Sequence, residues 1–442
     1  MTQAAAAPRP RRRPRTAGAL VVRTTELHGD APASLLDVLP DRAPLAWLRR
    51  GAGLVAWGEV ARVRVSGADR FAEAERAWHD LVARTVVRDD VGLPGSGPVA
   101  FGSFAFDDAA DDGGSLIVPR VVVGRRSGRT WLTTIDAGPR LGSAPDLATA
   151  VGEPTPVQPP GTVSYADGSR SASDWAAAVA RGVAAIRDGD LEKVVLARDV
   201  LAHTTNPVDP RWLLARLAAS YPTCWTFSVD GLVGATPELL TRSEKGLVTS
   251  RVLAGTIRRT GDDVADLARA ATLAHSSKDL EEHEYAVSSV AAALEPFCSS
   301  TNVPDVPFVL HLPNVLHLAS DVAGVLAARA DDEAAPSSLA LAAALHPTAA
   351  VCGTPTAAAR ALIKQIEGMD RARYAAPVGW IGADGDGEWG IALRCAQIDP
   401  DDHSRLRLFA GCGIVAASDP GAELAEAEAK LEPIRAALAA TD

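Results

Sequence analysis

Hydrophobic and polar residues follow two different periods along the chain, and this predicts a mixture of helices and strands. Apolar residues recur at helical spacing in three long stretches, residues 70–86, 171–188 and 262–294. Short apolar or β-branched runs predict strands, among them residues 19–23, 98–106, 131–135, 191–198 and 247–253. Strand-rich and helix-rich segments therefore alternate, and Gly102 indicates a bulge in its strand.

Caps and breakers indicate where several of these elements begin and end. Ser173 is a suitable cap for the helix that Gly189 ends. Asp419 can cap a later helix with Pro420 in its first position, where the missing amide hydrogen costs nothing. The proline-rich stretch 153–161 is expected to form a stiff surface connector.

The second half of the chain contains five further predicted features. A strand ends at residues 254–256, and the alanine-rich run after Ser320 is helix-like up to Ala344. Residues 384–387 form a hairpin turn, and 390–398 form the returning strand. A last strand then leads into a loop that begins at Gly411.

Composition excludes several classes of protein. The chain has 442 residues, 47% of them hydrophobic, which is enough for a large core. A net charge of −11 argues against nucleic acid as the main partner. Its five cysteines are scattered without a CxxC pair, as expected in a reducing cytoplasm. No apolar run approaches the ~20 residues that cross a membrane, and residues 1–16 are expected to be a disordered basic tail.

Candidate chemistry gathers first near the C-terminus. Gly411 and Gly413 would let the backbone approach an anion closely. On the helix that follows, Glu423, Glu426 and Lys430 share one face. Together these groups are suited to hold Mg²⁺ and a carboxylated substrate. From the spacing alone, however, a solvated helix face is the more common interpretation.

Four other charged residues are candidates for the site, and each also has a purely structural interpretation. Lys193 lies at the start of a predicted strand, where its ammonium either serves a site or reaches back to water. Glu238 follows a Thr-Pro pair and could simply belong to a turn. Arg394 has apolar neighbours, and a buried arginine needs a carboxylate partner. Helical periodicity places Glu282 opposite the apolar stripe of its helix, which favours a solvated side chain.

Six motifs between residues 171 and 442 resemble, in the same order, those of the chorismate-utilising enzymes. They are KVVLAR at 193–198, GATPE at 234–238, AGT at 254–256, KDLEEH at 278–283, LHPTAAVCGTP at 345–355 and GCGIVAASDPGAELAEAEAK at 411–430. Within the family they are most similar to the isochorismate synthases, which are related to anthranilate synthase component I and salicylate synthase.

The resemblance implies an α+β fold of intertwined subdomains, with two large antiparallel sheets packed between helical layers. Residues 17–160 would form the N-terminal α+β portion of this fold. Residues 161–442 would form the chorismate-binding catalytic region.

The resemblance also implies the ligands of the site. Glu282 and Glu426 would bind Mg²⁺, and Glu423 would lie close to the ion. The residues that would contact the substrate, chorismate, are Thr256, His317, Tyr374, Arg394, Gly411, Gly413 and Lys430.

In the implied reaction, water attacks C2 of chorismate and the C4 hydroxyl leaves, which gives isochorismate. Lys193 would activate the water, and Glu238 would protonate the departing hydroxyl. A base must be uncharged and an acid protonated to act in this way. Isochorismate serves menaquinone, siderophore and salicylate biosynthesis, and the enzymes that follow decide its use.

Two alternative functions and three absent partners complete the expectation. Salicylate synthase shares the catalytic residues and then eliminates pyruvate, and a degenerate family member would bind chorismate without turnover. The amine-forming relatives usually lack a lysine at the position of Lys193, so no glutaminase subunit is expected. A monomer acting on a small molecule, without nucleic acid or membrane, is expected.

Overall fold

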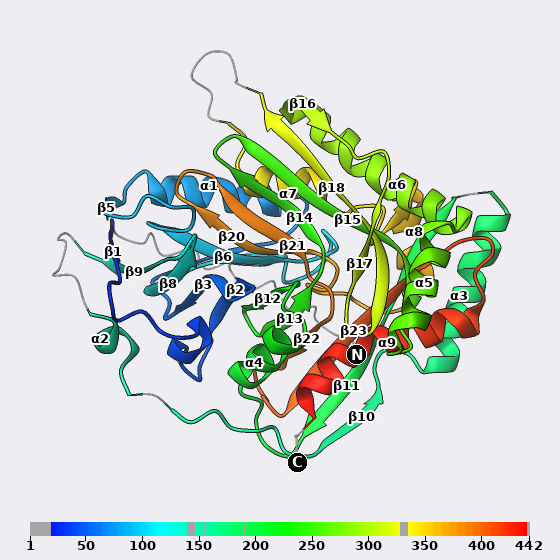
Figure 1. Cartoon of the computed structure of the whole chain (residues 1–442), viewed down its shortest axis with the longest axis horizontal. Helices are drawn as coiled ribbons and strands as arrows, with labels where there is room; N and C mark the ends of the chain where they lie inside the picture. The colour runs from blue at the N-terminus through cyan, green and yellow to red at the C-terminus, as the bar shows by residue number, and fades with distance from the viewer. Residues whose placement is uncertain (1–18, 139–145, 154, 190, 328–334, 440–442) are drawn as a thin grey trace, which may run out of the picture.

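The computed structural model describes residues 19–138, 146–153, 155–189, 191–327 and 335–439, so the predicted basic tail lies outside the described residues. Two large sheets form the centre of the molecule, and helices pack against both of them (Figure 1). This arrangement confirms the predicted α+β class with two sheets between helical layers. Among the described strand pairs, the edge pair β1 and β5 is parallel and the others are antiparallel.

The larger sheet contains thirteen strands. Across the sheet their order is β10 (Val163–Asp167), β11 (Lys193–Thr204), β23 (Arg405–Ile414), β22 (Cys395–Ile398), β13 (Leu232–Thr236), β12 (Trp225–Val229), β2 (Leu45–Arg49), β3 (Ala52–Trp57), β8 (Val121–Arg126), β9 (Arg129–Ala137), β1 (Leu20–Glu26) and β5 (Val86–Asp89), with β19 (Gly353–Thr354) beside β11. The helices that pack on this sheet are α3 (Ala172–Arg187), α4 (Pro210–Ser220), α8 (Thr356–Ile366) and α9 (Pro420–Leu438).

The smaller sheet contains ten strands. Their order is β16 (Cys298–Asn302), β18 (Val315–Leu326), β15 (Leu247–Arg258), β14 (Leu239–Glu244), β21 (Gly387–Ile391), β20 (Pro377–Gly382), β6 (Val99–Phe104), β7 (Gly114–Val118) and β4 (Ala61–Val65), with β17 (Phe308–His311) beside β18. The helices that pack on this sheet are α1 (Arg70–Val82), α5 (Asp263–Ala274), α6 (Ser277–Leu294) and α7 (Ser338–Leu345). The short α2 (Leu147–Val151) and two single-turn 3₁₀ segments, at residues 35–38 and 295–297, complete the described elements.

Each sheet includes strands from before and after residue 160, so the two portions of the chain are interleaved. The division at residue 160 stays a prediction. The two sheets are tied together at Glu388, whose carboxylate accepts hydrogen bonds from the indole nitrogens of Trp47 at 2.9 Å and Trp225 at 3.2 Å. Because all three side chains are buried, the polar groups of this contact satisfy one another.

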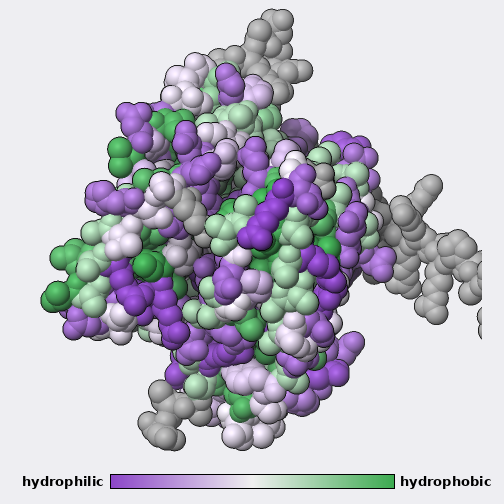
Figure 2. Space-filling model, turned by 90° about the vertical axis from the view of Figure 1, so that its right-hand side faces the viewer, coloured by the Kyte–Doolittle hydropathy of each residue, from purple (hydrophilic) through white to green (hydrophobic). Residues whose placement is uncertain are grey.

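The outer surface shows no strong segregation of side chains on the face seen in Figure 2. Hydrophilic and hydrophobic side chains are intermixed there, and neither kind forms a continuous layer over that face. Among the described residues, no helix combines the length and apolar character needed to cross a membrane.

Local signals predicted most helix boundaries correctly. Asp419 caps α9, its side chain accepts a hydrogen bond from the amide of Ala422, and Pro420 is the first helical residue. The cap of α3 is Ser171 rather than the predicted Ser173, because the Ser171 hydroxyl is the one that accepts from the amide of Asp174.

Three predictions were wrong, two about strands and one about a helix, each because a strand is completed by distant partners. Gly102 does not form a bulge: its pairing with β7 and β20 is regular, and a Cβ there would lie 2.7 Å from Leu116. Residues 254–256 do not end a strand, since β15 continues to Arg258 through an irregularity at Gly255. The run after Ser320 continues as β18 because it pairs with β15, and α7 begins only at Ser338.

Candidate active site

All twelve residues predicted for the site line one pocket, which is bounded by strands of both sheets and by α6 and α9. They are Lys193, Glu238, Thr256, Glu282, His317, Tyr374, Arg394, Gly411, Gly413, Glu423, Glu426 and Lys430. The structure thus places these residues together, while the role of each stays a prediction.

One wall of the pocket is formed by β11 and β23. Gly413 pairs with Val195, so the predicted glycine loop is in fact the end of a strand. A Cβ at Gly413 would lie 2.8 Å from Glu282 Oε1 and 2.9 Å from Lys193 Cε. A side chain at this position would therefore displace the ends of Glu282 and Lys193, which cross directly over the strand.

Lys193 is the first residue of β11, and its side chain is only 3% exposed. Its ammonium lies 2.8 Å from Glu282 Oε1, so it does not reach back to water. Because residues alternate between faces of a strand, Val194 and Leu196 point to the other side, where they approach Gly182 of α3. The strand therefore buries an apolar face against a helix and presents the lysine to the pocket.

Glu238 and Arg394 lie where the chain crosses from one sheet to the other. Glu238 stands between β13 and β14, and Arg394 stands between β21 and β22. The two crossings are hydrogen-bonded to each other, from the amide of Ala235 to the carbonyl of Arg394 and from the amide of Ile391 to the carbonyl of Glu238. The predicted single returning strand over 390–398 is therefore two strands of different sheets, separated by a turn in which Arg394 has φ +49°.

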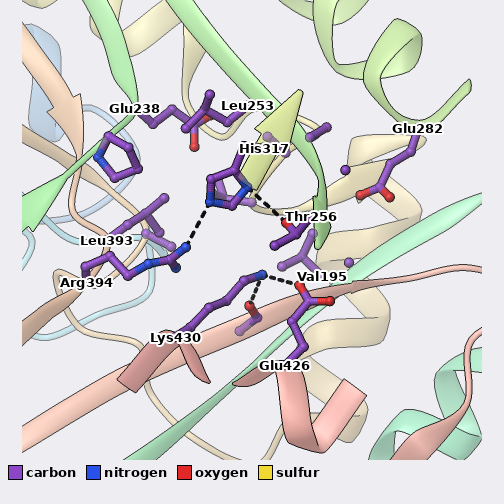
Figure 3. A pocket seen from close by; sticks show the side chains of 18 of the residues that line it. Val195, Glu238, Leu253, Thr256, Glu282, His317, Leu393, Arg394, Glu426 and Lys430 are labelled. Carbon is purple, nitrogen blue, oxygen red and sulfur yellow. Dashed lines mark hydrogen bonds and ion pairs between the residues drawn. The ribbon is translucent and has the colours of Figure 1, made fainter. Parts of the chain in front are cut away.

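Arg394 contacts His317 rather than the carboxylate that was expected as its partner. Arg394 Nη2 lies 3.2 Å from His317 Nε2, and Thr256 Oγ1 lies 3.0 Å from His317 Nδ1 (Figure 3). Within the described residues, no ion pair joins Arg394 to a carboxylate, although the arginine is 93% buried. A buried guanidinium without a carboxylate partner is suited to bind an anionic ligand.

Helices α6 and α9 bring acidic residues to the opposite part of the pocket. Glu282 of α6 pairs with Lys193, which overturns the expectation of a solvated side chain. On α9, Lys430 Nζ lies 2.6 Å from Glu426 Oε1 and donates a hydrogen bond to the carbonyl of Gly411 at 3.0 Å. The predicted shared face of α9 therefore faces the site and not the solvent.

Burial controls the protonation of two groups in the pocket. Desolvation raises the pKa of Glu238 to about 8, although Lys193 and Arg394 oppose the shift. Glu238 therefore carries a proton at neutral pH. Burial also raises the pKa of Tyr374, so its phenol stays neutral and can donate a hydrogen bond.

The acidic residues near α9 form a donor set that fits a hard cation. Carboxylate oxygens of Glu423 and Glu426 and the thiol of Cys412 lie within 4.8 Å of one another. Burial raises the pKa of the Cys412 thiol well above its usual range, so this sulfur stays protonated and is a poor ligand. The carboxylates that remain, with Glu282 in the same pocket, are the oxygen ligands that Mg²⁺ prefers.

Sequence reasoning missed two charged residues that also line the pocket. Asp279 lies three residues before Glu282 on α6 and so shares its face, a signal that the motif KDLEEH contained. For Arg371 the sequence contained no such signal. Its guanidinium donates hydrogen bonds to the backbone carbonyls of Val195 and Val351 and to the carboxylate of Glu367, and backbone partners leave no pattern in the sequence.

The fold and the pocket define an enzyme site for a small anion. Comparison with known proteins identifies the class: the family model described as "Chorismate binding enzyme" matches residues 46–439, so the chain belongs to the chorismate-binding enzymes. This confirms the predicted family.

Among its relatives is isochorismate synthase DhbC of Bacillus subtilis, 41% identical over 60% of this chain and 67% of the relative. Another is the salicylate biosynthesis isochorismate synthase of Pseudomonas aeruginosa, 33% identical over 95% of this chain and 90% of the relative. The solved structure of MenF, the menaquinone-specific isochorismate synthase of Escherichia coli, has the same fold, with a TM-score of 0.76 at 24% identity over 97% of this chain and 96% of that one.

Proposed function

We propose that this protein is an isochorismate synthase, which adds water at C2 of chorismate and releases the C4 hydroxyl. The observation that carries the proposal is that a buried lysine, Lys193, and a buried protonated acid, Glu238, line one pocket although they come from different parts of the chain. A base and an acid are what this substitution requires. Membership of the family and relatives named as isochorismate synthases support the same conclusion.

In this reaction Lys193 activates the attacking water, and Glu238 gives its proton to the departing hydroxyl. Chorismate carries two carboxylates, and the pocket offers cationic and neutral donors to hold them. Arg394 is free of a carboxylate partner in the described residues, and Lys430 and the phenol of Tyr374 lie in the same pocket. Charge-assisted hydrogen bonds from these groups would fix the ring between acid and base.

We propose Mg²⁺ as the cofactor, held by Glu282 and Glu426 with Glu423 beside them. When bound, the ion would neutralise and orient the ring carboxylate of the substrate. Few protein ligands and several retained waters are typical of Mg²⁺ sites. Both carboxylates contact lysines in this structure, Glu282 with Lys193 and Glu426 with Lys430.

The chemistry also indicates how the enzyme works in the cell. Water is the nucleophile, so we propose that no glutaminase subunit is needed. We also propose that a monomer is active. The five cysteines are all free, in keeping with the cytoplasm as the compartment.

Product analysis of the purified protein with chorismate tests the proposal. Isochorismate is expected as the only product, and a chelator should abolish its formation until Mg²⁺ is restored. Salicylate with pyruvate would contradict the proposal and indicate a salicylate synthase. Binding of chorismate without any product would indicate a degenerate family member.

The protonation of Glu238 predicts a pH dependence. The acid must be protonated to act, and its pKa is raised to about 8. We therefore expect kcat/KM, which reports groups of the free enzyme, to fall as the pH rises through about 8. Glu238→Gln should be much slower and lose this limb of the profile, because glutamine does not titrate. An unchanged limb in this variant would assign the titration to another group.

A further inference from the structure

Three side chains of the pocket form a hydrogen-bonded chain whose hydrogens can be placed from their chemistry: Thr256 of β15, His317 of β18 and Arg394 from the turn between β21 and β22. Arg394 lies 3.2 Å from Nε2 of His317, and Thr256 lies 3.0 Å from Nδ1 of the same ring (Figure 3). A guanidinium group has donors and no acceptor. Nε2 of His317 must therefore accept the hydrogen bond from Arg394.

The acceptor role of Nε2 fixes the tautomer of His317. A neutral imidazole has one donor and one acceptor nitrogen, so its proton is on Nδ1, which lies 3.0 Å from Thr256 Oγ1 as an acceptor. The doubly protonated ring is excluded because the guanidinium cannot accept a hydrogen bond from Nε2. Burial, together with Arg394 and Lys430, also holds the pKa of His317 well below its usual range, although a hydrogen bond to the backbone of Gly255 opposes this shift. Because Nε2 accepts from Arg394, Nδ1 must donate, so the contact with Arg394 determines which way the hydrogen bond to Thr256 runs.

The hydrogen bond from His317 in turn determines how the hydroxyl group of Thr256 can act in the pocket. Its oxygen accepts from His317, which leaves the hydroxyl hydrogen available for donation. Within the described part of the chain, this hydroxyl has no other hydrogen-bond partner, and Thr256 lines the pocket. The hydrogen is therefore free to point toward a bound ligand.

We propose that Thr256 is a hydrogen-bond donor of fixed direction to an oxygen atom of the substrate, and that Arg394 sets this direction through the positioning residue His317. The proposal rests on the proposed function, because it takes the ligand to be a carboxylated ring. The site then accepts an oxygen with a free lone pair, such as a carboxylate or ether oxygen, and disfavours an N–H group at that position. His317 itself transfers no proton to the substrate.

The tautomer is measured directly by NMR of the full-length protein labelled with ¹⁵N-histidine. We expect His317 to carry its proton on Nδ1 at neutral pH, with Nε2 unprotonated. A protonated Nε2, in either the other tautomer or the cation, would overturn the proposal. This measurement needs no variant of His317 except for assignment, and it does not depend on turnover.

A double-mutant cycle tests whether His317 acts through Thr256. Thr256→Val should lower kcat/KM for chorismate about ten- to a hundredfold, as expected for a lost hydrogen bond to a charged group, and Thr256→Ser should recover most of it. Adding His317→Gln to Thr256→Val should then cost less than about threefold more, because residues that act as a unit are not additive. Thr249→Val, on the same strand outside the pocket, should leave kcat/KM unchanged.

Independent, additive losses from the two sites would overturn the relay. Thermal unfolding of each variant shows whether it is folded. If the wild-type protein does not convert chorismate, the proposed function fails, and the cycle is then measured on the Kd of chorismate by calorimetry. The two failures are therefore distinguishable.

Discussion

Lys193→Ala is expected to reduce kcat by about 10²–10⁴-fold, the usual contribution of a general base, while chorismate still binds. The reason is geometric: the lysine side chain is 3% exposed, enters the pocket from the first residue of β11 and has Glu282 as its contact. Lys430, the other lysine that lines the pocket in the described part of the chain, could not take its place without moving, since Glu426 and the carbonyl of Gly411 hold it. Rates of isochorismate formation and calorimetric Kd values measure the two effects separately.

The control for this variant is Lys245→Ala, at an exposed turn between β14 and β15. It removes the same charge from the protein and should leave both kcat and Kd unchanged. Loss of chorismate binding in Lys193→Ala would make the lysine a substrate ligand, and an unchanged rate would contradict its assignment as the base.

Elements defined by local signals could be predicted from the sequence. The start of α9 at Asp419 and Pro420 depends on a cap and a proline, which act within a few residues. The glycine stretch could not be predicted in the same way, because Gly413 becomes part of a strand only by pairing with Val195, far away in the sequence. Glycine permits many conformations, so the partner decides which one is adopted.

The candidate site was harder to predict from residues alone than from the family resemblance. Helical periodicity favoured a solvated Glu282, because this pattern considers only the position of a residue relative to the apolar stripe of its own helix. It contains no information on Lys193, which lies on a strand and pairs with Glu282. The sequence around Glu238 also fits a simple turn. Its proton at neutral pH results from burial, which depends on the tertiary structure and cannot be read from neighbouring residues. The order of motifs that this chain shares with the family brought these residues together where spacing could not.

The crossings between the two sheets could not be predicted from the hydrophobic pattern of the sequence, which does not show when the chain passes from one sheet to the other. The apolar run over 390–398 suggests one strand, yet the chain leaves β21, turns at Arg394 and enters the other sheet as β22. The neighbouring crossing carries Glu238, and backbone hydrogen bonds hold the two together. Two charged residues thus reach the pocket because the two sheets exchange strands there.

The largest expected effect on stability comes from a residue that supports β11, the strand that begins with Lys193. Arg371→Ala should lower the free energy of unfolding by about 3–5 kcal/mol, as expected when one partner of a buried ion pair is removed. Arg371 and Glu367 form this pair at 2.6 Å, with side chains 2% and 1% exposed. The guanidinium also donates to the carbonyls of Val195 and Val351 at 2.7 and 2.8 Å, and Glu367 accepts from the amide of Ala197 at 2.7 Å.

Arg371 and Glu367 supply β11 with hydrogen bonds that a neighbouring strand would otherwise make, at Val195 and Ala197. On that side β11 is paired with β19 at its start and with β10 toward its end, so the backbone between them depends on other partners. Replacing both charged residues by leucine should therefore not restore stability, although such replacement of an isolated buried pair is often neutral. Each backbone group left unpaired costs about 1–3 kcal/mol.

Urea unfolding followed by fluorescence measures these differences, with Arg360→Ala as the matched control. Arg360 lies on α8 and pairs with Asp107 and Asp108 at 28% exposure, so its loss should cost less than about 1 kcal/mol. A double leucine variant as stable as the wild type would show that Arg371 and Glu367 serve only each other. A double variant that stays destabilised would show that their main partner is the strand that carries Lys193.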